Sequence, residues 1–198
     1  MIRSYRLRNP QVKLNGDEIL DNTKLIQDYV NTLHKDIHGD EENLATPAEL
    51  TSWLAANQLG QPGVKAGAAD LRQAKELREA LRTLLLAKNE VEVDEAPAQD
   101  VLDRMACKAR VGLRFENGEP ALVPTASGVT GALGRIVVAV HDAVADGSWQ
   151  RLKACRCRDC EWAFVDTAKN QSRAWCSMRS CGNREKARAY RARQAHSS

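Results

Sequence analysis

The chain has 198 residues, 43% of them hydrophobic, which supplies enough apolar side chains for a folded core and excludes an intrinsically disordered protein. The first residues, Met1 to Arg6, lead into charged sequence instead of an apolar signal segment, and no run of about 18 apolar residues follows. We therefore expect a cytoplasmic protein without a membrane partner.

The net charge of +3 conceals an uneven distribution along the chain. From Arg151 onward there are 12 Lys or Arg and 4 Asp or Glu, a balance of +8, whereas residues 1–150 carry a balance of −5. An acidic body followed by a basic tail predicts that the tail contacts a polyanion. The alternative is a charged tail that only increases solubility.

The first predicted element is a turn at Asn15-Gly16-Asp17, around which the N-terminal segment either forms a strand pair or stays loose. Apolar residues in Leu25–Leu33 then recur at helical spacing and predict an amphipathic helix that ends near Gly39. His34 and His38 would lie one turn apart on that helix, a spacing that can seat a metal ion. No third ligand accompanies them in the sequence, so we interpret the two histidines as part of a solvated helix face.

Two further helices are indicated by a start signal and by periodicity. In Thr46-Pro47-Ala48-Glu49 the threonine can cap, the proline suits the first helical position, and the glutamate follows three residues after the cap. The longest periodic segment, Ala68–Lys88, places leucines on one side and Arg78 and Arg82 on another. It predicts a long amphipathic helix.

The next segments are predicted as a loop, a short helix and a hairpin. Glu90–Gln99 is acidic and contains a proline, which favours a loop. The helix Asp100–Ala109 follows, and Cys107 within it is interpreted as a small buried residue. Asn117-Gly118, between two short apolar runs, is the strongest hairpin signal in the chain.

A last body helix, Gly131–Ala145, ends at Asp146-Gly147-Ser148, which is the predicted domain boundary. We call residues 1–147 the body and residues 151–195 the cysteine module. The body has no glycine-rich phosphate loop and no nucleophile elbow, so no catalytic residue is assigned. The predicted fold class is α+β: a mainly helical body with a small β-hairpin, followed by a four-cysteine zinc finger.

The cysteine module carries the clearest chemical signal. Cysteines clustered in a chain without a secretory signal indicate a metal site more than disulfides. Two pairs separated by 15 residues match a structural zinc site, in which each sulfur lies about 2.3 Å from the ion. The segment has few aliphatic residues to fold by burial, which further supports Zn²⁺ as the cofactor. Five of the six cysteines fall within 27 residues: Cys155, Cys157, Cys160, Cys176 and Cys181.

Five cysteines for four positions leave two choices for the first pair. Cys157 and Cys160 have the familiar two-residue spacing, whereas Cys155 and Cys160 leave four residues between them. The second pair, Cys176 and Cys181, also leaves four, and this symmetry favours Cys155, Cys160, Cys176 and Cys181 as ligands. Cys157 is then a spectator or a substitute ligand. In a third interpretation, Cys157 forms a disulfide on oxidation and releases the metal.

The aromatic residues between the two cysteine pairs are expected to cover the metal site. Trp162, Phe164 and Val165 predict one arm of a β-hairpin, and Trp175 precedes a ligand directly. A cysteine turn, a hairpin and a second cysteine turn leading into a helix describe a treble-clef finger.

The helix predicted from Asn183 onward is basic nearly all round, with only Glu185 to offset its charge. Guanidinium groups match phosphates bidentately, so this helix is predicted to contact nucleic acid. The assigned contact residues are Arg184, Lys186, Arg188, Arg191 and Arg193.

At these positions the chain resembles the CGNR zinc-finger family, whose naming tetrapeptide stands here as Cys181-Gly182-Asn183-Arg184. The family's first pair has the Cys-x4-Cys form, which Cys155 and Cys160 match, so the resemblance supports the same four ligands. Further matching positions are Trp175-Cys176-Ser177-Met178, Lys186-Ala187-Arg188, Phe164, Asp166 and Asn170.

Upstream, Asp28–Thr32, Leu44–Pro47 and Trp53-Leu54 resemble the ABATE domain, which habitually precedes this finger. The resemblance implies a bacterial, stress-induced transcription regulator with a sensing or assembly body and a DNA-contacting finger.

The function expected from the sequence is a zinc-dependent DNA-binding transcription regulator that responds to stress. The alternative is an RNA-binding or protein-interaction zinc module attached to a body that senses a small molecule. A homodimer is compatible with both, through the surfaces of Ala68–Lys88 and Gly131–Ala145. An enzyme is not expected, because four thiolates leave no open position on zinc.

Overall fold

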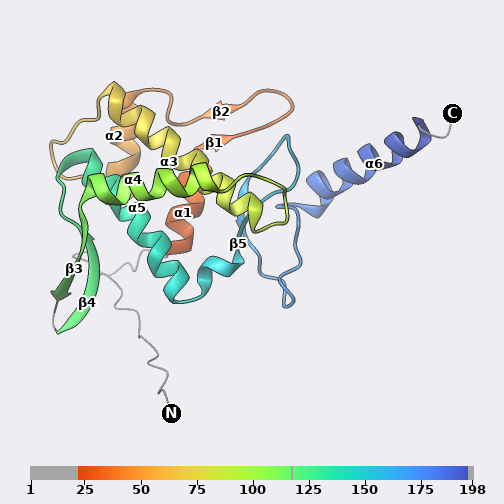
Figure 1. Cartoon of the computed structure of the whole chain (residues 1–198). Helices are drawn as coiled ribbons and strands as arrows, with labels where there is room; N and C mark the ends of the chain where they lie inside the picture. The colour runs from red at the N-terminus through yellow and green to blue at the C-terminus, as the bar shows by residue number, and fades with distance from the viewer. Residues whose placement is uncertain (1–21, 117, 196–198) are drawn as a thin grey trace, which may run out of the picture.

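The computed structural model describes residues 22–116 and 118–195, and Figure 1 shows their arrangement. The turn predicted at Asn15-Gly16-Asp17 lies outside these residues, as does Asn117 at the hairpin tip. In chain order the elements are α1 (Asn22–Val30), β1 (Leu33–His34), β2 (Glu41–Glu42), α2 (Pro47–Ala56), α3 (Ala68–Ala87), α4 (Ala96–Ala109), β3 (Val111–Glu116), β4 (Glu119–Pro124), α5 (Gly128–Ala145), the 3₁₀ turn η1 (Ser148–Arg151), β5 (Leu152–Ala154), β6 (Ala163–Val165), the short π-type turn η2 (Met178–Gly182) and α6 (Asn183–Ala195).

Within residues 22–116 and 118–195, three separate antiparallel strand pairs accompany the helices, so the predicted α+β class is confirmed. β3 pairs with β4 across the predicted hairpin, with Val111 opposite Pro124 and Leu113 opposite Leu122. β5 pairs with β6, with Leu152 opposite Val165, and the first cysteine pair lies in the connection between these two strands.

The body core forms where α5 packs against α1 and α4 and where α3 packs against α4. This core extends past the predicted domain boundary, because Trp149, Leu152, Ala154 and Ala163 belong to the same buried cluster as the body helices. The β5–β6 hairpin of the cysteine module therefore rests on the body instead of hanging from a linker. α5 is long and apolar enough to span a membrane by length and composition, but half of it is buried in this core.

The start of α2 is the one that the sequence predicts. The Thr46 hydroxyl accepts a hydrogen bond from the Glu49 N–H at 3.3 Å, and the Glu49 carboxylate accepts one from the Thr46 N–H at 2.7 Å. This reciprocal capping box satisfies two backbone donors that the first helical turn leaves without partners.

The first helix is shorter than predicted, because α1 ends at Val30 and not near Gly39. The Asn31 side chain turns to the backbone of β6, and the Thr32 hydroxyl donates back to the Tyr29 carbonyl at 2.7 Å. The chain then forms the β1–β2 hairpin. His34 and His38 thus do not share a helix: His34 lies in β1, with its ring against Trp162, and His38 lies in the connecting loop.

Three other predictions on the body need correction. α4 begins at Ala96 and not at Asp100, since the Asp94 carboxylate accepts from the Ala96 N–H and a proline suits the first turn. α5 begins at Gly128, three residues earlier than predicted. Cys107 is exposed and not buried, because α4 turns this side chain away from the core.

Arg78 and Arg82 of α3, on the side of the helix away from the predicted leucine stripe, are almost fully buried, each 2% exposed. Arg78 makes two hydrogen bonds to the Glu42 carboxylate, at 2.7 and 2.9 Å, which fasten β2 to α3. Arg82 donates to the carbonyls of Val30 at 2.7 Å and of Glu161 at 2.8 Å. One guanidinium therefore joins the end of α1 to the cysteine module.

Candidate metal centre and basic helix

Two short segments bring the cysteines together. Cys155 follows β5, and the chain turns so that the Cys160 N–H donates to the Cys157 carbonyl at 2.9 Å. In the second segment, Cys176 precedes η2 and Cys181 lies within it. The Ser177 side chain opens η2 by accepting from the Ser180 N–H. Both segments are tight turns that aim sulfur atoms at one point.

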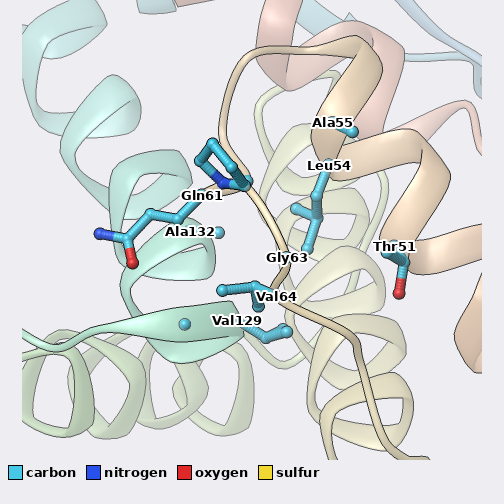
Figure 2. A pocket seen from close by; sticks show the side chains of 11 residues that line it. Thr51, Leu54, Ala55, Gln61, Gly63, Val64, Val129 and Ala132 are labelled. Carbon is cyan, nitrogen blue, oxygen red and sulfur yellow. The ribbon is translucent and has the colours of Figure 1, made fainter.

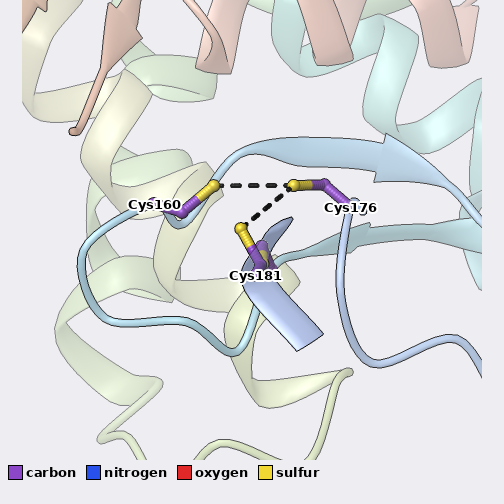
Figure 3. A group of neighbouring side chains, drawn as sticks. Cys160, Cys176 and Cys181 are labelled. Carbon is purple, nitrogen blue, oxygen red and sulfur yellow. Dashed lines mark hydrogen bonds between the residues drawn. The ribbon is translucent and has the colours of Figure 1, made fainter. Parts of the chain in front are cut away.

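The sulfur atoms of Cys155, Cys160, Cys176 and Cys181 all lie within 4.8 Å of one another. The Cys176 sulfur is 3.6 Å from that of Cys160 and 3.7 Å from that of Cys181, as Figure 3 shows. Four sulfurs placed tetrahedrally about 2.3 Å from a zinc ion are separated by about 3.8 Å. The two short separations and the all-thiol donor set therefore fit Zn²⁺.

The electrostatics of the cluster show why it suits a cation. Hydrogen bonds from Cys160 and Cys176 lower the pKa of the Cys155 thiol, and the bond to Cys155 raises the pKa of Cys160. The packed sulfurs thus hold one thiolate readily and resist further deprotonation, because like charges would gather in a buried space. A divalent cation removes this repulsion and binds the deprotonated sulfurs.

Aromatic side chains surround the cluster as predicted. Phe164 is 5% exposed and packs against the cysteines, with Trp162 and Trp175 at the margin. The Arg173 guanidinium covers the Phe164 ring at 4.8 Å from its centroid. Such a cover excludes water from metal–thiolate bonds.

Cys157 is fully buried but lies outside the group of four close sulfurs. Its sulfur is 4.0 Å from the Arg184 guanidinium. Burial raises the pKa of the Cys157 thiol to about 11. The oxidation-switch interpretation of this cysteine stays a prediction.

Asp166 organises the segment between the two cysteine pairs. Its carboxylate is fully buried and accepts hydrogen bonds at 2.9 Å from the Lys153 ammonium and from the N–H groups of Ala168 and Arg173. Burial alone would disfavour the charged carboxylate, but these bonds hold its pKa below the ordinary value. The family pattern marks this position, yet its three partners become visible only in the fold.

The helix α6 projects away from the rest of the molecule, with no buried residue along its length (Figure 1). The five predicted contact residues do not share one environment. Lys186, Arg191 and Arg193 are exposed, and the Arg191 guanidinium donates to the Ala187 carbonyl at 3.3 Å. Arg184 faces Cys157 instead.

Arg188 has an acidic partner that the sequence did not reveal. Its guanidinium contacts the Asp159 carboxylate at 2.6 Å and that of Glu185 at 2.5 Å. The hydrogen bond to Asp159 is the main cause of the raised pKa of Arg188. Because Asp159 comes from the first cysteine turn, this contact joins α6 to the opposite side of the metal centre.

The cysteine module is attached to the body by polar contacts as well as by the shared core. The Asn31 side chain pairs with both backbone groups of Ala163, at 2.9 and 2.8 Å. The Asn89 side chain donates to the carbonyls of Ala154 and Ala174, at 2.7 and 2.8 Å. Both cysteine pairs are thereby fixed relative to the body helices.

The body contains a pocket of about 300 Å³ between α2, the loop of residues 60–64 and the start of α5 (Figure 2). Leu54, Val64, Val129 and Ala132 give it a mainly apolar lining, and Thr51 supplies a hydroxyl. No local sequence pattern predicts this pocket, because its lining residues come from three separate segments.

Comparison with protein families agrees with this geometry. Residues 151–194 match the family model described as "CGNR zinc finger", so the four close thiols form a zinc centre. Residues 23–147 match the ABATE model, described as "Putative stress-induced transcription regulator". No protein with a curated description matches the sequence. Since the second match spans more than half of the chain, this zinc-binding protein belongs to the ABATE family and carries a CGNR zinc finger after its ABATE domain.

Proposed function

We propose that the protein is a DNA-binding transcription regulator whose zinc centre positions α6 against the duplex. The observation that carries the proposal is the exposure of α6: a thirteen-residue helix, rich in arginine, leaves the metal centre with no buried residue. A helix that buries nothing gains no stability from packing, and most of its basic side chains are exposed to solvent, where another molecule can reach them. Phosphates are the partners that guanidinium groups match best.

The contacts within the module divide the basic residues by role. Arg184 and Arg188 face the first cysteine turn, and they set the direction in which α6 leaves the metal centre. Lys186, Arg191 and Arg193 are exposed along the projecting part and are assigned to phosphate contact. The zinc ion has a structural role in this arrangement, since four thiolates leave no open position for catalysis.

The test is a fluorescence-anisotropy titration of duplex DNA with the zinc-loaded full-length protein over a range of salt concentrations. Affinity should fall as salt rises, because each phosphate contact releases counterions. The triple variant Lys186→Ala, Arg191→Ala, Arg193→Ala should reduce the slope of log affinity against log salt by about 1 per residue removed.

The matched control removes the same three charges from the body. Lys65, Arg72 and Lys108 are exposed there, and their triple alanine variant should keep the salt slope of the parent protein. Equal losses in the two triple variants, or affinity that does not change with salt, would exclude α6 as the DNA contact. Competition with structured RNA and with single strands identifies the preferred polyanion.

A second candidate function is favoured by the exposed apolar side chains of the module. Met178 is 48% exposed in η2, and Tyr190 is 58% exposed on α6. Exposed Met and Tyr side chains are frequent at protein interfaces. In this case the module binds a protein partner and the body pocket takes a small, mainly apolar effector. A Met178→Ser, Tyr190→Ser variant with unchanged DNA affinity and lost regulatory activity would favour this candidate.

A further inference from the structure

A second pocket, of about 280 Å³, lies where the end of α3 meets the cysteine module. We call it the junction pocket. Three of its lining residues, Asn89, Lys153 and Ala174, are buried. Glu90, Gln171 and Ser172 are exposed and form its rim. Solvent therefore reaches it directly, and all of its lining side chains except one are polar: Lys88, Asn89, Glu90, Lys153, Arg156, Gln171, Ser172 and Ala174.

The charges of the junction pocket do not balance. The Lys153 ammonium pairs with the buried Asp166 carboxylate at 2.9 Å, and the Arg156 guanidinium pairs with Glu90 at 2.5 Å. The third cation of the pocket is Lys88. Within residues 22–116 and 118–195, Lys88 forms no ion pair with a carboxylate.

Lys88 is held by neutral groups only. Its ammonium donates to the carbonyls of Trp149 and of Leu152, the latter at 2.9 Å, and lies 4.2 Å from the centre of the Trp149 ring. Burial and the neighbouring charge of Lys153 lower the pKa of Lys88 to about 7. An ammonium that is partly desolvated and repelled by a second one gains free energy when it pairs with an anion.

We propose that the junction pocket binds a small oxyanion, carried as a phosphate or a carboxylate group, with the Lys88 ammonium as its charge partner. Lys153 and Arg156 also line the pocket, and the exposed residues Gln171 and Ser172 offer polar side chains. This site is separate from the zinc centre and from the DNA-contacting face assigned to α6.

The position of the pocket links the anion to the metal centre. Arg156 stands between Cys155 and Cys157, and Ala174 precedes Cys176 by two residues. The Arg156 N–H donates to the Ala174 carbonyl at 3.0 Å, and the Arg156 guanidinium donates to the Asn89 carbonyl at 2.5 Å. An anion held here contacts the end of α3 and both cysteine segments at once, so it fastens the module to the body.

The test is isothermal titration calorimetry on the zinc-loaded full-length protein, without nucleic acid. The probes are inorganic phosphate, sulfate and succinate, each measured against sodium chloride at equal ionic strength. Saturable binding of one anion per chain is the expected result. Phosphate and sulfate without succinate indicate a phosphate-type group, and succinate alone indicates a carboxylate. The absence of saturable heat with all three probes overturns the proposal.

Three variants separate the pocket from general electrostatics. Lys88→Met keeps the apolar stem and should weaken binding about tenfold or more, the usual effect of losing a charge-assisted hydrogen bond. Lys108→Met removes an exposed lysine from the end of α4 and should leave the affinity unchanged. Glu90→Gln removes the rim carboxylate that competes for Arg156 and should tighten binding severalfold.

Zinc content and far-ultraviolet circular dichroism verify that each variant is folded. Equal effects of Lys88→Met and Lys108→Met contradict the assignment, as does Glu90→Gln with unchanged or weaker binding. Glu90 is exposed, so Glu90→Gln should leave the fold intact. Its anion affinity therefore tests the proposal even if Lys88→Met destabilises the fold.

Discussion

The Asp159 carboxylate and the Arg188 guanidinium, 29 residues apart in the sequence, lie 2.6 Å apart in the structure. The contact spans the metal centre, from the first cysteine turn to the second turn of α6. Because α6 buries no residue, its direction depends on this ion pair and on its junction with η2. The ion pair is therefore a positioning element for the basic helix.

Asp159→Asn should loosen α6 without releasing zinc. A largely exposed ion pair contributes little to stability, so amide exchange in α6 should become only a few-fold faster. Hydrogen-exchange mass spectrometry of the C-terminal peptides measures this change. Asp103→Asn, an exposed carboxylate of α4, is the control and should leave α6 unchanged. Unaltered exchange in Asp159→Asn contradicts a positioning role.

Zinc binding should depend on four of the six cysteines. A change to serine at any one of Cys155, Cys160, Cys176 and Cys181 should lower the bound zinc well below one ion per chain. Each of these substitutions removes one sulfur of the close group. Cys157→Ser and Cys107→Ser should retain a full ion. Metal analysis after gel filtration, with the charge-transfer bands of the cobalt-substituted protein, provides the measurement. Loss of zinc in Cys157→Ser would place that sulfur in the coordination sphere.

Asn31→Ala should destabilise the folded chain by about 2–4 kcal/mol, because it leaves a buried N–H and a buried carbonyl of Ala163 without partners. Urea unfolding measures the loss of free energy. Asn57→Ala is a suitable control, since the Asn57 side chain donates locally, to the Trp53 carbonyl of the preceding helix, at 2.8 Å. It should cost less than about 1 kcal/mol. Equal losses of unfolding free energy in the two variants would show that the contact of Asn31 with Ala163 adds no more stability than a local hydrogen bond.

Stability should rise between about pH 7 and pH 10 through Lys88. Its pKa in the folded state is lowered from the ordinary value of 10.5 to about 7, so across this window the unfolded chain binds more protons. The free energy of unfolding then increases with pH. Solvent screening at this half-buried site limits the rise to on the order of 1–2 kcal/mol.

The measurement is the difference between the stability curves of the parent protein and of Lys88→Met. Groups that titrate in both proteins cancel in this difference, including the cysteines. The rise should be present in the parent curve and absent from the variant. A difference that is flat from pH 7 to pH 10 would show that Lys88 keeps its ordinary pKa.

The features that the sequence predicted well depend on residues close together along the chain. The capping box needs only Thr46 and Glu49, and the β3–β4 hairpin needs a turn between two short runs. The cysteine spacing, supported by the family pattern, likewise predicted which four sulfurs the fold brings together. In each case the physical cause acts over a few residues, or through one motif.

The features that the sequence did not predict depend on contacts between distant segments. β1 and β2 have two residues each, and the bonds from Arg78 to Glu42 hold β2 to α3. The exposure of Cys107 depends on which side of α4 meets the core. The two pockets likewise combine residues from separate elements, and no local sequence pattern predicts such a combination.

The β5–β6 hairpin, which shares the body core, has a consequence for any attempt to cut the chain into two parts. A fragment that begins at residue 151 would present Leu152, Ala154 and Ala163 to water, and the remaining fragment would lose the side chains that cover α3 and α1. Each fragment would expose an apolar surface that promotes aggregation. Because the two parts share one core, we expect loss of the zinc ion to lower the stability of the body as well as that of the finger.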